Sequence, residues 1–425
     1  MPTASERTAG VARVRDPRLD FFRGAGMFII FVAHVPENTW QYLIPARFGF
    51  SDATEMFVFC SGMASAVAFG RLYDTAGFWL ATGRVLQRVW QVYWAHVGVF
   101  LVSVVALIAA DKVLCSDGHI RAASTLNEFL SRDPGLALFG FLTLTYQPKY
   151  YDILPMYIVI LAMMPLVMAL SRVSLAAVAA FVGAVWLIGV TGHLQFPGEP
   201  WTGDTWFFHP FGWQLVFFTG FALMRGWLPA PPVERRLVWL SAGILAASFP
   251  LAWWPLIDRS PELTAAHKFI EPLLDKNLFG ILRYVHFLAL AYLAYVAAGP
   301  GGSRISGAVA AVIVKVGQQT LAVFMAGIVL AMLGGIILDE TDRSFFTTAL
   351  VNIAGLAGLV VTAYVAGWFK SAPWNKHHGV KAGAPARDGS RGMSGIRLHA
   401  VVSNARSGDQ AAASSDSSIA SSHKT

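Results

Sequence analysis

The sequence predicts an all-α protein, a polytopic membrane helix bundle of about ten transmembrane helices with one short re-entrant or interfacial helix. Hydrophobic residues make up 55% of the chain and charged residues only 13%, whereas soluble domains are about 25% charged. Long apolar runs also alternate with short polar loops, which is the pattern of chains that cross a bilayer repeatedly.

The apolar runs define the expected spans in chain order. Each run approaches or exceeds the roughly 20 residues that an α-helix needs to cross the hydrocarbon core. The apolar segment 135–146 has only about twelve residues, so we expect it to be re-entrant or interfacial. The expected spans are 20–42, 52–70, 85–110, 152–170, 174–191, 208–226, 236–257, 279–298, 309–338 and 345–369.

The distribution of Lys and Arg predicts which loops are cytoplasmic. Basic residues precede the first span and follow alternate spans from the second onward, whereas the opposite loops are poorer in them and include the acidic stretch DETD. By the positive-inside rule both termini are cytoplasmic. We therefore divide the chain into a cytoplasmic N-terminal segment (1–18), a transmembrane domain (19–370) and a disordered basic cytoplasmic tail (371–425).

Composition also excludes several classes of protein. The net charge of +7 comes largely from the tail, so no basic surface on a folded domain suggests nucleic-acid binding. The two cysteines, Cys60 and Cys115, are too few for a disulfide framework or a cysteine metal site. No histidine–glutamate spacing of the zinc-protease type occurs, so we expect no bound metal and no bound cofactor.

The first apolar helix carries three polar residues on one face. Arg23 and His34 are eleven residues apart, which at about 100° per residue brings them back to nearly the same side. Asp20 lies one turn before Arg23 on that stripe. Ionisable groups inside membrane helices are costly and usually functional. The alternatives are a structural ion pair between Asp20 and Arg23 and a hydrogen-bonded histidine in the bundle interior.

Further ionisable residues occur in the next two spans. Asp52 and Glu55 stand at the outer end of the second span, and Arg84 and Arg88 at the inner end of the third. The two arginines could simply extend to the inner lipid headgroups. Together with the first stripe, however, a cationic inner end and acid and base groups at the outer end suit a path across the membrane.

Several later polar residues are candidates for binding an acceptor or an acyl group on the outer side. Aromatic belts at the membrane interface explain the aromatic members of this set about as well as a site does. Aromatic and hydrogen-bonding groups gathered at an outer face would also suit a carbohydrate. These candidates are Asp152, Trp213, Gln214, Arg283 and His286, with Lys149 close to Asp152. Asp52 and Glu55 belong to the same set, as groups that could hold the tautomer of the histidine or bind sugar hydroxyls.

Several of these strings resemble a known family. "LDFFRGAGMFIIFVAH" resembles the opening of the membrane acyltransferase-3 superfamily, whose first helix carries an Arg, ten residues and then a His. "FVFCSGMA" and "GRVLQRVWQVY" are similar to that superfamily's Ser-Gly run and two-arginine motif. Within it, "FGFSDATEMFVFCSG", "LTLTYQPKYYDILPMYI" and "FGWQLVFFTG" resemble the OpgC type. The resemblance covers about residues 16–370.

The resemblance implies an inner-membrane O-acyltransferase that moves an acyl group, succinyl in the OpgC type, from cytoplasmic acyl-CoA to hydroxyls of a periplasmic glucan. His34 would act as general base, and Arg23 with Asp20 would stabilise charge beside it. Arg84 and Arg88 would bind the phosphates of acyl-CoA. An acyl-enzyme route through His34 is the alternative. Arg283 or Lys149 could bind the second carboxylate of a succinyl group.

Two rival classes follow from the same polar residues. A transporter of a small or anionic solute also needs polar groups at mid-membrane, usually with internal repeats or broken helices. Pro155 and Pro165 within one expected span are compatible with such a helix. A membrane haem protein needs two axial ligands that face each other, which two of the histidines His34, His96 and His286 would have to supply.

Overall fold

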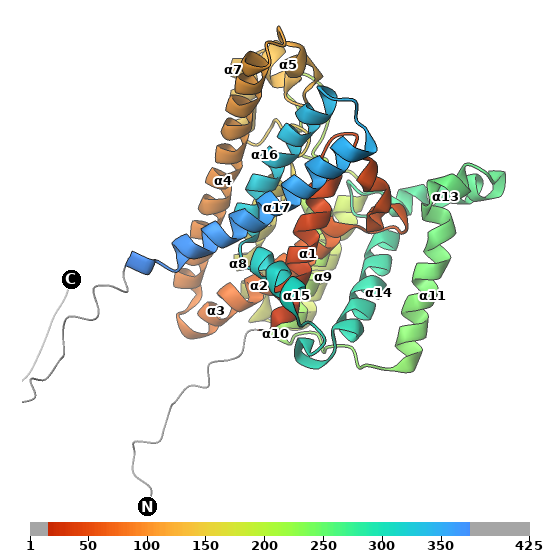
Figure 1. Ribbon diagram of the computed structural model, residues 1–425. Coiled ribbons are helices and arrows are strands. Elements are labelled where there is room, and N and C mark those ends of the chain that lie inside the picture. The colour runs from red at the N-terminus through yellow and green to blue at the C-terminus, as the bar shows by residue number, and fades with distance from the viewer. Residues whose placement is uncertain (1–15, 375–425) are drawn as a thin grey trace, which may run out of the picture. The chain divides into compact units, whose positions relative to one another are not determined.

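The computed structural model describes residues 16–374, and the regular structure within that range is helical (Figure 1). In this part of the chain the recorded β-pairing is one isolated bridge between Pro197 and Thr205. The predicted all-α class is therefore confirmed. The arginines before residue 16 and nearly all of the predicted tail lie outside the described residues.

Most of the expected spans correspond to long helices. Their bounds differ from the expected ones by a few residues, as is usual for helix ends. These helices are α1 (Pro17–His34), α4 (Phe78–Val113), α8 (Ile153–Ser171), α9 (Leu175–Val190), α10 (Pro210–Arg225), α11 (Arg235–Ala252), α14 (Ile281–Ala298), α16 (Thr320–Asp339) and α17 (Phe345–Lys370).

The second span is composite, and shorter helices lie between the long ones. The second span consists of α2 (Ala53–Ser65), a π-helical turn η3 (Ala66–Gly70) and α3 (Arg71–Thr75). The short helices are η1 (Thr39–Leu43), η2 (Pro45–Arg47), α5 (His119–Ala123), α6 (Asn127–Ser131), α7 (Pro134–Leu142), α12 (Trp254–Ile257), α13 (Pro261–Leu274), η4 (Pro300–Gly302) and α15 (Ala308–Gln318).

Six of the described helices are long and apolar enough to cross a membrane. They are the composite Ala53–Thr75, α4, α8, α14, α16 and α17. The helices α9 and α15 are apolar but shorter. The helix α1 carries its three charged residues within its first seven positions. A multi-pass membrane protein is therefore supported, whereas the count of about ten spans is not confirmed.

The first span is shorter than the sequence predicted. It ends at His34, where Val35 adopts an extended backbone conformation. Pro36 follows, and a proline both lacks a backbone N–H and disfavours helical geometry in the residue before it. The expected range 20–42 was therefore too long at its outer end. This termination leaves His34 as the last helical residue of α1.

The expected span 309–338 is not one helix. It divides into α15 and α16 at Gln319, whose φ and ψ of −118° and 28° are not helical. Close backbone contact with α1 accompanies the break, since a Cβ on Gly317 would lie 1.7 Å from the carbonyl oxygen of Asp20. Only glycine permits helices to approach this closely. The break places a helix N-terminus inside the bundle.

The segment 135–146 does not form a crossing helix. Its helix, α7, has nine residues, or about 14 Å of length, and lies with α5 beside one end of α4 (Figure 1). The loop 258–278 contains a helix that the sequence did not predict. This helix, α13, has no buried residue, and Phe269 on it is 86% exposed. It packs against α11 and α14 at the edge of the bundle (Figure 1).

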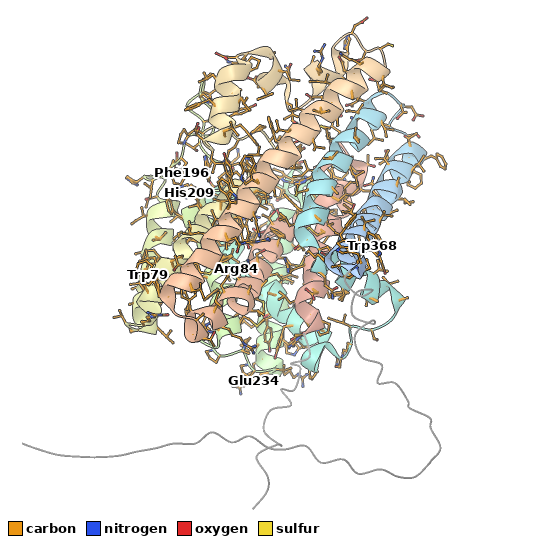
Figure 2. All side chains as sticks on the ribbon, turned by 90° about the vertical axis from the view of Figure 1, so that its left-hand side faces the viewer. Trp79, Arg84, Phe196, His209, Glu234 and Trp368 are labelled. Carbon is orange, nitrogen blue, oxygen red and sulfur yellow. The ribbon has the colours of Figure 1, made fainter. Side chains whose placement is uncertain are left out.

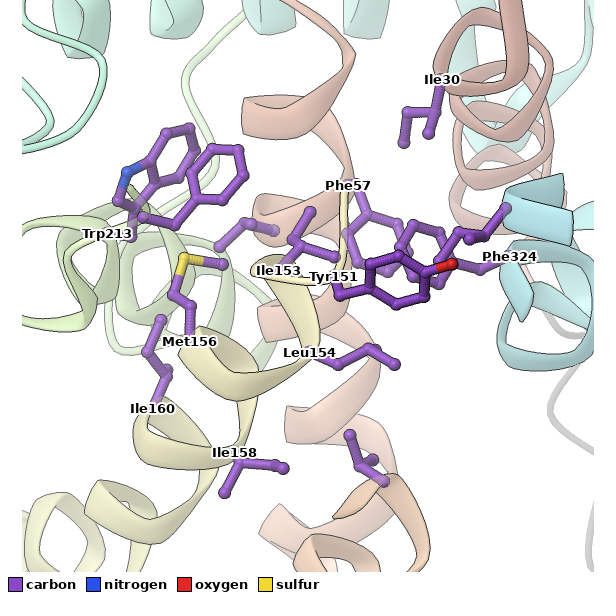
Figure 3. Close-up of a cluster of buried hydrophobic side chains, with 14 of the residues drawn as sticks. Ile30, Phe57, Tyr151, Ile153, Leu154, Met156, Ile158, Ile160, Trp213 and Phe324 are labelled. Carbon is purple, nitrogen blue, oxygen red and sulfur yellow. The ribbon is translucent and has the colours of Figure 1, made fainter. Parts of the chain in front are cut away.

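The first helix lies inside the bundle and contacts α2, α15, α16 and α17 (Figure 1). Its buried face includes Ile30 and Phe31. Figure 3 shows Phe57 of α2 and Phe324 of α16 side by side below Ile30, and their stacked rings are 6.0 Å apart between centroids. Tyr151 adds its ring to this cluster. This apolar cluster lies close to the end of α1, because the ring centroid of Phe324 is 6.4 Å from that of His34.

Candidate active site

His34 is held by aromatic contacts at the end of α1. Its ring centroid lies 5.0 Å from that of Tyr150 and 6.4 Å from that of Phe324. Tyr150 adopts a left-handed backbone conformation with φ of 78°, which is unfavourable for a residue with a bulky side chain. Such strain is often found at functional sites. No hydrogen bond from the imidazole to another described residue is recorded, so its ring nitrogens are available to a substrate.

A cavity of about 370 Å³ opens beside His34. This size lies within the range of pockets that hold small ligands. The cavity is bounded by the end of α1, the loop around α5, the turn at Tyr150 and the last turns of α16. Its lining residues are His34, Pro36, His119, Ile120, Ala123, Ser124, Thr125, Tyr150, Tyr151, Ile328, Ala331, Met332, Gly335, Ile336, Asp339 and Glu340.

A second, very small void of about 10 Å³ lies on the other side of His34. It is lined by apolar residues of α1 and α16, among them Ile30, Val323 and Gly327. Phe324 and His34 also line it. Since His34 lines both spaces, its imidazole lies between the open cavity and the small void at α1 and α16.

Arg23 lies about three helical turns before His34 on α1. Its guanidinium donates a hydrogen bond to the hydroxyl of Thr320, the first residue of α16. No side chain caps this N-terminus, and the positive end of a helix attracts anions. Asp20, one turn earlier on α1, is 1% exposed. Arg23 and His34 are separated by about 16 Å along α1, so they do not belong to one contact cluster.

Asp52 and Glu55 begin α2 with a capping box. The side chain of Asp52 accepts from the backbone of Thr54, and Glu55 accepts from the backbone N–H of Asp52. This D-x-x-E pattern is a local signal for a helix start. The box therefore fixes both carboxylates at the N-terminal end of α2.

Two cations from a distant part of the chain neutralise these carboxylates. Lys276 Nζ lies 2.6 Å from Asp52 Oδ2, and Arg283 lies 2.5 Å from Glu55 Oε1 and 3.6 Å from Asp52. Burial alone would raise the pKa of Asp52, but the charges of Lys276 and Arg283 outweigh it and hold that pKa well below its usual range. The charges of Lys276 and Asp52 also act on His34. This network is thus the electrostatic environment of the imidazole.

Asp152 is a further buried carboxylate near the cavity. It precedes α8, is 9% exposed, and follows the strained Tyr150 by two residues. Burial raises the pKa of Asp152 to about 6, although the charges of Lys276 and Lys149 oppose that shift. The structure therefore brings Asp152 into the electrostatic range of the network at Asp52.

The remaining outer candidates support loops. Trp213 donates from its indole Nε1 to the backbone carbonyl of Lys276 at 3.0 Å, which helps to place that lysine. Gln214 donates to the carbonyl of Val182 at 2.8 Å. His286 shares a hydrogen bond of 2.7 Å with the buried hydroxyl of Ser51. These three side chains hold the backbone around the network, and none of them lines the cavity.

Arg84 and Arg88 lie apart from these residues. Arg84 is exposed on α4 (Figure 2) and donates to Gln87, while Arg88 donates to Gln91. The nearby Trp90 is 60% exposed. The structure therefore places both arginines on an outward-facing side of α4 and does not bring them to His34 or to the cavity.

Sequence reasoning missed Lys276 as a site residue. It stands in a polar loop, and 224 residues separate it from Asp52. No periodicity or spacing links positions that far apart. The only available signal was that Asp52 and Glu55 begin an apolar span and have no cationic residue within it. Because buried carboxylates need a partner of opposite charge, this pattern implies that cations from distant segments pair with them.

Comparison with known proteins adds one match. A family model described as OpgC protein matches residues 15–371, a range that includes every helix from α1 to α17. No curated protein and no solved structure matches the chain. Only residues 1–14 and 372–425 lie outside the match.

Proposed function

Because the chain belongs to the OpgC family, we propose that it is an O-acyltransferase of the inner membrane. In this proposal it moves a succinyl group from cytoplasmic acyl-CoA to a hydroxyl of a periplasmic glucan. The observation that carries the proposal is the position of His34 between the open cavity and the small void. The acceptor would enter from the cavity, and the donor would reach the same imidazole from the opposite side.

His34 acts as the general base in this reaction. The imidazole takes the proton of the acceptor hydroxyl while the oxygen attacks the thioester carbonyl. The C–S bond then breaks, and the imidazolium returns the proton to the leaving thiolate. An imidazole with no recorded hydrogen bond inside the described bundle is free to make this contact. The alternative route, in which His34 itself carries the acyl group, uses the same nitrogen.

Arg23 and the N-terminus of α16 hold an anionic part of the donor. A guanidinium and unpaired backbone N–H groups are both strong donors to phosphate or carboxylate oxygens. Arg23 is about 16 Å from His34 along α1, so it acts on a part of the donor remote from the reacting carbonyl. Arg84 and Arg88 remain predicted phosphate contacts at the cytoplasmic end of α4.

The network at Asp52 sets the charge around His34. Lys276 and Arg283 balance the two carboxylates, which keeps the surroundings of the imidazole close to neutral. Arg283 is already bonded to Glu55, and Lys276 is the more exposed of the two cations. Because both cations are already paired with carboxylates, we assign them to fixing the positions of Asp52 and Glu55 rather than to binding the succinyl group.

The test is mass spectrometry of periplasmic glucans from cells with the intact protein, without it, and with His34→Ala. We expect succinyl-sized substituents only with the intact protein, because general-base catalysis contributes about 10²–10⁴-fold to the rate. His193→Ala, a change of the same type in an exposed outer loop, is the matched control and should retain them. Detection of the His34→Ala protein in membranes excludes loss of insertion. Full substitution in the His34→Ala strain would refute the mechanism.

Transport of a small or anionic solute is the second candidate. The break between α15 and α16 favours it, because discontinuous helices with an N-terminus in the membrane form the substrate sites of many transporters. An unchanged glucan pattern in the strain without the protein would favour transport. Uptake of labelled organic anions into vesicles that contain the protein would then be measured.

A further inference from the structure

The cavity beside His34 opens next to a mostly acidic group of residues. We call this group, Glu37, Asp339, Glu340, Asp342 and Arg343, the acidic rim. Asp339 and Glu340 at the end of α16 line the cavity, as does Pro36. Glu37 follows that proline and is 81% exposed. Asp342 lies before the next helix, α17, and accepts a hydrogen bond from the backbone N–H of Ser344, the N-cap residue of that helix. Three of these carboxylates belong to the stretch DETD, which has no role in the reaction described above.

A single arginine balances part of this charge. Arg343 forms an ion pair with Asp339, lies 3.7 Å from Glu37, and donates to the carbonyl of Pro36. The acidic rim therefore holds four carboxylates and one guanidinium, a formal charge of −3.

The facing wall does not neutralise the rim. It contributes His119, Ser124 and Thr125 to the cavity lining. Behind them Arg121 is paired with Asp111 at 2.8 Å. The wall thus offers hydroxyl and imidazole groups that suit a sugar, and its arginine is already balanced. Lys149, whose ammonium lies 5.5 Å from the ring centroid of the cavity-lining Tyr150, adds one positive charge. The acidic rim and this lysine together still carry a formal charge of −2, so the net charge around the mouth of the cavity is negative.

We propose that the acidic rim is an electrostatic filter that admits uncharged, hydroxyl-rich acceptors and rejects anionic ones. The inference rests on the proposed function. Each succinyl transfer converts one neutral hydroxyl into a half-ester with a free carboxylate, so the product carries one more negative charge than the acceptor. The filter therefore favours release of the product and disfavours a second transfer close to an existing succinyl group.

Selectivity between matched acceptors tests the filter. The purified full-length protein in lipid nanodiscs is given succinyl-CoA and either a neutral β-glucan oligosaccharide or the same oligosaccharide with one carboxymethyl group. We expect kcat/KM for the neutral acceptor to be higher by on the order of tenfold at low ionic strength. In 0.5 M salt the preference should fall below about threefold, because the Debye length shrinks to a few ångströms.

Charge-neutralising variants provide the second arm. Glu37→Gln/Glu340→Gln removes two rim charges and should cut the low-salt preference to about threefold or less. Glu199→Gln/Glu271→Gln removes the same charge from a half-buried loop position and an exposed helix position, neither of which lines the cavity, so it should keep the full preference. A salt-independent preference in the native protein, or an equal preference in both double variants, would overturn the filter. Absence of transfer to either acceptor by the native protein would instead overturn the proposed function, and the filter with it.

Discussion

The close contact between α1 and α15 leads to a direct test of the packing. In Gly317→Ala the added Cβ would lie 1.7 Å from the carbonyl oxygen of Asp20 and 2.9 Å from the backbone nitrogen of Gly24. A comfortable contact needs about 3.5 Å. Both neighbours are backbone atoms of α1, so no side chain can rotate away. The two helices must separate by roughly 2 Å.

This separation has a cost that can be estimated. Overpacking a well-packed interior typically costs about 1–3 kcal/mol, and a backbone-to-backbone clash belongs at the upper end of that range. The free energy of unfolding should therefore fall by about 3 kcal/mol. At roughly 2–3 °C per kcal/mol, the melting temperature should drop by about 6–9 °C. Movement of α15 also shifts Thr320 away from Arg23, so the KM for acyl-CoA should rise.

Thermal unfolding of the detergent-solubilised protein measures the first effect, and steady-state kinetics measure the second. Gly243→Ala in α11 is the matched control, because a Cβ there meets no atom within 4 Å. Alanine is also the better helix former by about 1 kcal/mol, so this control should be as stable as the native protein or slightly more so. Equal melting temperatures for the two variants would refute the close contact.

Two further predictions concern the charged groups near His34. Lys276→Met leaves the carboxylate of Asp52 with only the more distant Arg283, so the free energy of unfolding should fall by about 1–3 kcal/mol and glucan substitution should decrease. The double variant Lys276→Met/Asp52→Asn removes both charges and should recover part of the stability. No recovery in a thermal unfolding assay would contradict the pairing. The pKa of the Asp152 carboxyl is about 6 in the folded protein, compared with 3.8 for an aspartate that is not buried. Ionisation of this carboxyl therefore lowers the free energy of unfolding. The penalty is absent below about pH 4, grows as the pH rises, and is complete above about pH 6. Asp152→Asn should therefore be more stable than the native protein by up to about 3 kcal/mol above pH 6 and no more stable below pH 4; a stability gain that does not depend on pH would contradict this assignment.

Local patterns in the sequence determined the parts of the site that depend on one helix. The shared face of Arg23 and His34 follows from helical periodicity. The end of α1 at His34 is consistent with the chemistry of Pro36, although the predicted span 20–42 extended beyond that proline. The capping box at Asp52 and Glu55 is likewise a local signal, and it gives this predicted functional pair a structural role at the start of α2. Fold class and membrane character followed from composition, because a bilayer demands long apolar helices.

The tertiary structure alone decided the contacts between distant segments. The pairing of Lys276 with Asp52 joins positions 224 residues apart, and the sequence contains no spacing rule that links them. The break at Gln319 was invisible because the run 309–338 is apolar throughout, so its composition does not mark where the backbone leaves the helix. The cavity at His34 arises only where α1, α5 and α16 meet. Helix periodicity is a property of neighbouring residues, whereas charge neutralisation and cavity shape depend on how separate helices pack together.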